Sequence, residues 1–112
     1  MKDNSIIGSW VLIQSEVSTI EPKSEIFQFI KNGRFNMCYP NGITKLFYLL
    51  EEDVIRFGDR RKMFHKMGVS FEGDVMIILG SHGMESYYRK LTKEELPDWA
   101  DDTTILKSND IS

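Results

Sequence analysis

A chain of 112 residues, with 41% hydrophobic and 28% charged residues, has the length and balance of one globular domain, which excludes a second domain and wholesale disorder. The net charge of −3 is unevenly spread: residues 1–91 hold 12 Lys and Arg against 11 Asp and Glu, a balance of +1, and residues 92–112 hold 2 against 6, a balance of −4. Nucleic-acid binding usually depends on a concentrated basic face, so this nearly neutral body predicts no nucleic-acid partner.

The single cysteine, Cys38, excludes an internal disulfide, and no Cys/His spacing resembles a zinc site. Cys38 lies in an apolar run, which predicts a buried structural thiol and fits a reducing compartment. The N-terminal residues lack the apolar core of a signal peptide, and no run has the length of a membrane span. We therefore expect a cytoplasmic protein, unless a leader has been removed, with no membrane partner and no cofactor or metal.

Short β-like runs recur along the chain, separated by turn signals, and this rhythm is typical of a β-sandwich or barrel. In chain order the predicted strands are residues 9–17, 25–30, 34–39, 43–50, 54–57, 62–71, 75–79 and 84–91. Asn32-Gly33 is the strongest hairpin signal, because both residues tolerate positive φ. Gly68 lies within the sixth run and predicts a bulge or break there.

Helical features are predicted only near the C-terminus. The run from Thr92 to Leu96 resembles a capping box that opens one short helical turn, which Pro97 stops. We divide the chain into a β domain over residues 1–91 and a short helical turn with a flexible acidic tail over residues 92–112. Trp99 is the exception in this tail, because a lone tryptophan among carboxylates usually docks on something.

The predicted fold is all-β: one eight-strand antiparallel meander that closes into a small barrel. Every connection is short enough to join antiparallel neighbours, and pairing the first strand with the last removes both sheet edges. Eight strands leave an interior that side chains can fill or that holds one small ligand. An open two-sheet sandwich is the alternative.

The chain resembles lipocalins and small bacterial lipocalin-like domains in three places. Gly8-Ser9-Trp10 is similar to their opening Gly-x-Trp, residues 29–35 to their hairpin with phenylalanines around a glycine, and residues 87–91 to their closing strand. The resemblance implies that Gly8 and Trp10 are structural, that Trp10 plugs the closed end of the barrel, and that Arg89 stacks on it. The chain is shorter than true lipocalins, and the strands of true lipocalins are longer.

A ligand site inside the barrel follows as an expectation. Tyr87 and Arg89 lie two apart on the last predicted strand and therefore share a face, which could hold an anionic head group if that face is inward. A register slip of one residue would exchange the two faces, so the lining set depends on the register. The other predicted lining residues are Phe27, Phe29, Met37, Phe47, Met63 and His65.

Met63, His65 and Met67 alternate on one face of the sixth run, where core packing is weighed against a soft-metal site. The basic cluster, residues 60–62 with Lys66 nearby, is read as a solvated turn rather than a docking patch. Most carboxylates fall at turns, and no nucleophile or phosphate-binding motif is present, so we expect no catalytic residue and no enzyme activity.

The predicted function is therefore that of a non-enzymatic, lipocalin-like binding protein that holds a small apolar or amphipathic ligand in its barrel. The alternative is a protein-interaction module with a packed core, such as an inhibitor, immunity or adaptor protein, which would bind its partner through Trp99 in the acidic tail. The sequence leaves open whether the protein is a monomer or a homodimer.

Overall fold

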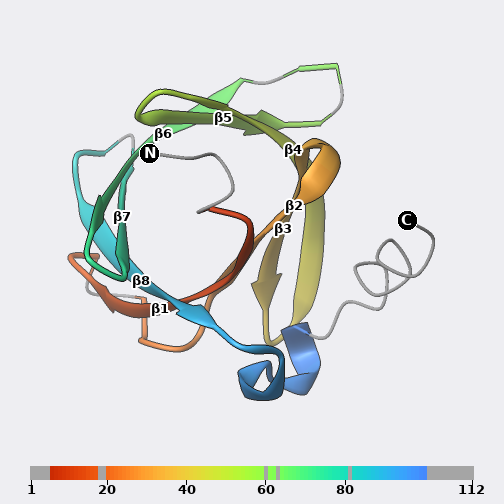
Figure 1. Cartoon of the computed structure of the whole chain (residues 1–112), viewed down its shortest axis with the longest axis vertical. Coiled ribbons are helices and arrows are strands. Elements are labelled where there is room, and N and C mark those ends of the chain that lie inside the picture. Colours follow the sequence, from red (N-terminus) through yellow and green to blue (C-terminus); the bar gives the residue numbers. More distant parts are fainter. Residues whose placement is uncertain (1–5, 18–19, 60, 63, 81, 101–112) are drawn as a thin grey trace.

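The strands form a closed ring in the computed structural model, which describes residues 6–17, 20–59, 61–62, 64–80 and 82–100. Each strand pairs antiparallel with its chain neighbours, and β1 pairs with β8, so the meander closes into a barrel (Figure 1). The strands are β1 (Gly8–Ser15), β2 (Ile26–Ile30), β3 (Arg34–Tyr39), β4 (Gly42–Glu51), β5 (Val54–Gly58), β6 (His65–Glu72), β7 (Val75–Leu79) and β8 (Glu85–Leu91). The predicted closed barrel is confirmed, and the sandwich alternative is excluded.

The residues in the turns determine how consecutive strands of this meander are connected. The β2–β3 connection is a short 3-10 turn, η2 (Lys31–Gly33), in which Asn32 has φ 73° and Gly33 has φ 77°. Both residues thus adopt the positive φ that the Asn-Gly signal predicted.

Gly68 is the residue at which β6 changes its pairing partner. Residues His65 to Gly68 pair with β5 and residues Gly68 to Glu72 pair with β7, whereas a register shift is seen in β1 between Leu12 and Gln14. A Cβ atom at this position would lie 3.3 Å from the Cβ of Leu79, a tight contact that a larger residue would have to relieve by moving Leu79.

Side chains alternate between the two faces of each strand and build two separate clusters. The interior cluster includes Trp10, Phe29, Phe35 and Met76, whereas the smaller outer cluster contains Cys38 and Ala100. Because adjacent residues point to opposite faces, one apolar strand contributes to both clusters.

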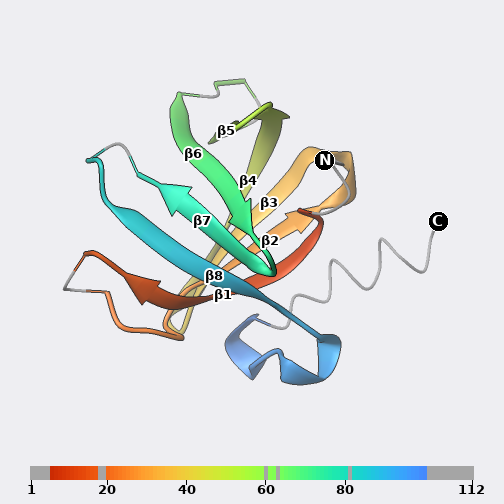
Figure 2. The same cartoon turned by 60° about the vertical axis from the view of Figure 1, so that its left-hand side comes forward.

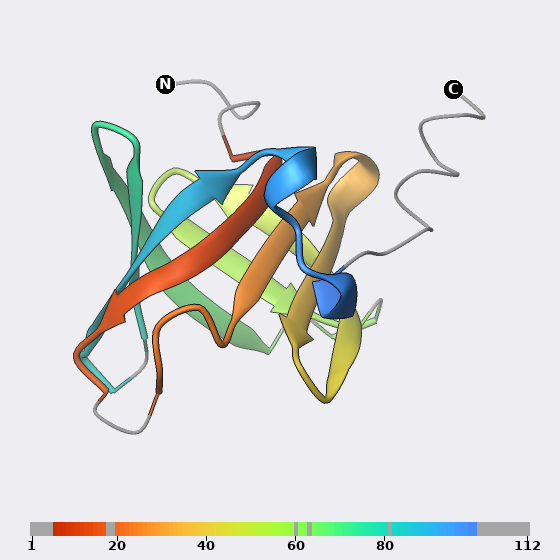
Figure 3. The ribbon, with the colours of Figure 1, turned by 90° about the horizontal axis from the view of Figure 1, so that it is seen from below.

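The C-terminal segment forms the cover of the outer cluster. It contains two 3-10 turns, η3 (Lys93–Glu95) and η4 (Asp98–Ala100), and we call residues 92–100 the strap. Figure 3 shows the strap on the outside of the barrel beside β1, β2 and β3. The predicted capping box is confirmed, with reciprocal bonds between Thr92 and Glu95.

Candidate functional site

One end of the barrel is plugged by Trp10. The indole is 4% exposed, its Nε1 donates to the carbonyl oxygen of Ile6 over 2.9 Å, and its ring lies 5.9 Å from the ring of Phe71. The cation above the indole is Lys90, whose Nζ lies 5.1 Å from the ring centroid. Arg89 was the expected partner, and this assignment is wrong because Arg89 points to the opposite face of β8.

The interior between the two ends is filled by aromatic rings. Phe29 and Phe35 stack with centroids 4.7 Å apart, and Phe27 stacks on Tyr88 at 4.9 Å. Phe57 packs edge-on against Phe35 at 5.7 Å. These contacts occupy the position where a lipocalin-like cup would hold its ligand, so a ligand there would have to displace side chains.

The structure separates the eight predicted lining residues. Phe27 and Phe29 are buried in the interior cluster, and Met37 packs against it. Phe47 alternates with the inward-facing Leu46 and Tyr48 and therefore lies on the outer face of β4, where it was not expected.

Of the remaining predicted lining residues, those that the structure describes do not line a common interior site either. Tyr87 and Arg89 flank the inward-facing Tyr88, so both point outward and neither anchors an interior ligand. His65 is exposed at the barrel's other end, with its ring 5.2 Å from that of Phe57, and Met63 lies outside the described residues.

That other end holds a buried carboxylate, which we call the mouth carboxylate. Glu25 is 9% exposed and accepts hydrogen bonds from the hydroxyls of Tyr88, over 2.5 Å, and Tyr39, over 2.6 Å. Burial first, and then the neighbouring carboxylate, raise the pKa of both tyrosines. Ile20, from the β1–β2 connection, packs on the interior cluster at this end.

The strap is fastened to the barrel by a glutamine that points outward from β2. Gln28 is 1% exposed, and its Nε2 donates to the carbonyl oxygen of Ala100 over 3.0 Å and to the Oγ of Ser9 over 3.2 Å. Its Oε1 accepts from Asn36 over 3.0 Å and from the thiol of Cys38 over 3.4 Å. A polar layer on the outside of the barrel is therefore buried and satisfied only with the strap in place.

Beside this layer, the strap and the barrel wall enclose a hollow of about 360 Å³, the strap groove. Val11, Ile26 and Leu91 belong to the cluster that forms its apolar floor, and Trp99 packs on the same cluster from the strap. The complete lining is Val11, Lys23, Ile26, Arg89, Leu91, Glu95, Pro97 and Trp99. Two residues that the sequence assigned to different sites, Arg89 and Trp99, thus meet in one groove.

Charge in the strap groove is arranged around Arg89. Its Nη1 lies 3.3 Å from the Oε2 of Glu95, and both side chains are partly exposed. The backbone N–H of Thr92 and the nearby guanidinium of Arg89 hold the pKa of Glu95 below its usual value. With Lys23 the groove carries two cations and one carboxylate, an excess of one positive charge.

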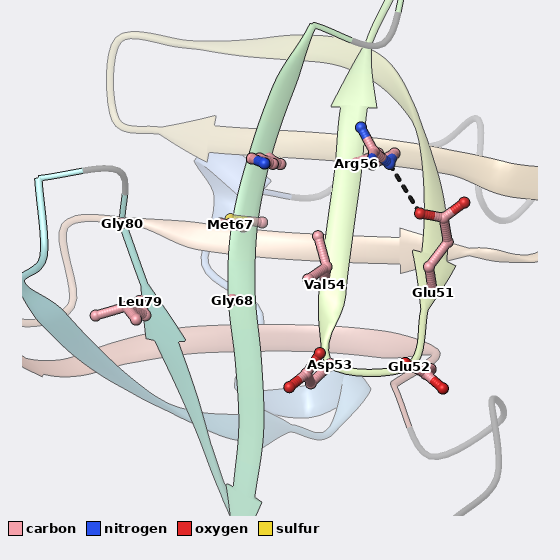
Figure 4. A pocket seen from close by; sticks show the side chains of 10 residues that line it. Glu51, Glu52, Asp53, Val54, Arg56, Met67, Gly68, Leu79 and Gly80 are labelled. Atoms are coloured by element: carbon pink, nitrogen blue, oxygen red, sulfur yellow. Dashed lines mark hydrogen bonds and ion pairs between the residues drawn. The ribbon is translucent and has the colours of Figure 1, made fainter.

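A second groove, of about 490 Å³, lies over β5, β6 and β7 (Figure 4). Glu51, Glu52 and Asp53 stand at its rim, but Figure 4 shows Glu51 bonded to Arg56 and the other two carboxylates at the turn, apart from one another. Within the described ranges, no group of three or more His, Cys, Asp or Glu side chains could hold a metal ion. This groove therefore offers acidic charge without convergent ligands.

Comparisons with known proteins identify no family for this chain. No protein-family model matches the chain, and no curated protein matches its sequence. Among the described residues, no helix is long and apolar enough to cross a membrane.

Sequence reasoning missed Glu25, Gln28 and Lys23. Glu25 alternates with Phe27 and Phe29, so the same parity that placed the two rings inside could have placed the carboxylate with them. Gln28 stands alone among the apolar residues of β2, which is the sequence signal of a strand buried on both faces.

Proposed function

We propose that this chain is a non-enzymatic binding protein whose site is the strap groove, outside the barrel, and that its ligand is a small amphipathic anion. The observation that carries the proposal is the convergence of an apolar floor, the Trp99 ring and two cations in one hollow. Its volume falls in the range of small-molecule sites, about 300–1,000 Å³.

The floor supplies the affinity for the apolar part of such a ligand. Val11 and Ile26 are 6% and 1% exposed, and they are held by strand pairing on both sides. The apolar part of a ligand that lies between them and Trp99 would be removed from water. Each Å² of apolar surface buried in this way contributes about 25 cal/mol to binding. Rigid strands on one side and a docked strap on the other make the groove preformed.

The cations supply the preference for an anionic head group. Arg89 presents a planar fork of N–H donors, which suits a carboxylate or sulfonate. Lys23 sits in the left-handed region at φ 67°, with its N–H bonded to the carbonyl oxygen of Leu12 over 2.8 Å. This conformation costs a residue other than glycine about 1–3 kcal/mol and fixes the lysine beside the groove.

The packed interior favours this outside site over an interior one. A protein-interaction module with a packed core is the second candidate, and the filled barrel suits it equally. However, Trp99 lies against the outer cluster instead of projecting from the tail, so it does not offer the exposed aromatic anchor that this candidate needs.

Titration calorimetry with decanoate, decanol and decylamine tests the proposal. Decanoate should bind most tightly and decylamine least, because the groove has an excess of one positive charge. Trp99→Ala and Arg89→Gln should each weaken decanoate binding by about tenfold or more. Tyr87→Phe is the matched control, since Tyr87 lies on the same outer face of β8 but does not line the groove.

Two results would overturn this site. Decanoate binding that survives both groove substitutions but is lost in an interior variant such as Met37→Trp would return the site to the barrel interior. Equal affinity for all three decyl compounds would remove the role of the two cations.

A further inference from the structure

We infer that the tip of the β5–β6 hairpin is a second, independent interaction surface, which docks on an anionic lipid membrane. Phe64 at this tip is 73% exposed, the highest exposure among the large apolar side chains of the described residues. A single exposed apolar residue is ordinary, but this one is surrounded by cations.

The cations stand on the tip and along the outer face of the hairpin. Lys62 holds its Nζ 5.5 Å from the centroid of the Phe64 ring, and Arg61 precedes it in the turn. Lys66 lies farther along β6 and is exposed. We call Arg61, Lys62, Phe64 and Lys66 the basic tip; Arg60 belongs to the same run in sequence but lies outside the described residues.

The turn is built so that these side chains face outward. The Oδ1 of Asp59 accepts hydrogen bonds from the backbone N–H groups of Arg61, over 2.9 Å, and Lys62, over 3.1 Å. The one carboxylate at the tip is thus engaged with the backbone, and it fixes the turn from which the cations extend.

An anionic surface would relieve a repulsion that the hairpin carries. Lys66 is directly opposite Arg56 in the β5–β6 register, and both side chains point outward. Like charges directly opposite each other destabilise a strand pair. Among the described residues the guanidinium of Arg56 pairs with Glu51 at 2.8 Å, which offsets part of this repulsion.

The place of the tip in the ring keeps it apart from the carboxylates of the β1–β8 wall and from the strap groove. In an eight-strand ring β5 lies across the barrel from β1 and β8, and Glu16 and Glu85 are on that far wall. Figure 2 shows the hairpin tip projecting at the top and the strap at the bottom of the molecule. The tip can therefore approach a flat surface without the strap.

The shape of the tip favours lipid over single-stranded nucleic acid. Non-specific nucleic-acid sites combine a basic groove with several stacking rings, whereas the basic tip is a convex turn with one ring. Peripheral membrane contacts need a projecting apolar residue among cations, and the anionic leaflet attracts each Lys or Arg near it. The sequence analysis expected no membrane partner because no run is long enough for a membrane span, and a surface contact requires no span.

Co-sedimentation of the full chain with phosphatidylcholine vesicles, with and without phosphatidylglycerol, tests this inference. Binding should require phosphatidylglycerol and decline at high salt, because the Debye length falls from about 10 Å at 0.1 M to about 3 Å at 1 M. The double variant Arg61→Glu with Lys62→Glu should bind at least about tenfold more weakly, and Phe64→Ala about fivefold more weakly.

Matched controls come from the opposite end of the barrel. Lys31→Glu and Leu49→Ala change an exposed cation and an exposed apolar residue there, and both should leave vesicle binding unchanged. Equal binding to vesicles without phosphatidylglycerol, an equal loss in the controls, or tighter binding to a single-stranded oligonucleotide would overturn the inference. Unchanged melting temperatures confirm that the variants are folded.

Discussion

The interior cluster and the strap cluster bury side chains on opposite faces of the same strands, and they do so by different means. Inside, phenylalanine rings pack directly on one another. Outside, the strap is held by the hydrogen bond from Gln28 to Ala100, beside a smaller apolar contact, and Asn36 of β3 donates to the same glutamine. The interior is therefore suited to hold the fold, and the strap to form a site whose cover depends on a few bonds.

The largest effect that would separate the two regions is expected from Phe35→Ala. Phe35 is fully buried and touches three other phenylalanine rings, so its truncation should cost about 3–5 kcal/mol of unfolding free energy. Urea unfolding followed by circular dichroism measures this loss. Phe64→Ala, which removes an exposed ring, should stay within about 0.5 kcal/mol.

A loss below about 1 kcal/mol for Phe35→Ala would contradict the packed interior. It would mean that the surrounding rings collapse easily, as they would around a displaceable ligand. The interior would then be the candidate binding site, and it would contribute less to the stability of the fold than the comparison assumes.

Gln28→Ala should have an intermediate effect that is confined to the strap. It removes the side-chain donor to the buried carbonyl of Ala100 and the acceptor of the Asn36 amide, at a cost of about 1–3 kcal/mol. Because Cys38 is fully buried beneath the strap and is the only cysteine of the chain, its rate of reaction with a thiol reagent reports strap release. This rate should rise while the far-ultraviolet spectrum stays unchanged.

The matched control for this change is Gln14→Ala, since Gln14 is an exposed glutamine on β1. An unchanged thiol reaction rate in Gln28→Ala would show that the apolar contact alone holds the strap. A rate that rises equally in both variants would show a general loosening of the barrel.

The smallest expected effect is a change in melting temperature with pH. It comes from the two tyrosines that donate to the mouth carboxylate, and it is absent at neutral pH. The pKa values of Tyr39 and Tyr88 are raised in the folded protein, so the unfolded chain loses these protons first, at its ordinary value of 10. The stability from their neutral forms is complete below pH 10 and is lost as the pH rises above it. Melting temperatures should therefore decline more steeply above pH 10 than below it.

A Tyr88→Phe variant sharpens this test. It lowers stability at every pH, because the mouth carboxylate loses a donor, but it should flatten the alkaline decline. A decline of unchanged steepness in this variant would assign the alkaline transition to other groups.

The sequence predicted strand number, strand order and most strand bounds to within one residue, because turn residues and alternation are local signals. The predicted run over residues 75–79 matches β7, and the run over residues 34–39 matches β3. The sixth strand begins later than predicted, at His65, since the residues before it form the hairpin tip rather than part of the ladder.

The site was predicted less well, because it depends on which face each residue occupies and on a segment far away in sequence. Arg89 and Lys90 are adjacent cations, and only the register decides that Lys90 covers Trp10 while Arg89 enters the strap groove. The contact of the strap with Gln28 joins residues that are distant in the chain, and no local pattern encodes such a contact.

The pairing of β1 with β8 has a consequence for how the protein is made. Ser9 pairs with Leu91, so the ring cannot close during synthesis until the last strand, β8, has left the ribosome. Until then the meander has two open sheet edges, which are templates for pairing with other chains. Such long-range closure is also slow, since loop entropy is lost before the contacts form. The last strand is thus the step at which a nascent chain changes from an aggregation-prone sheet to an edgeless one.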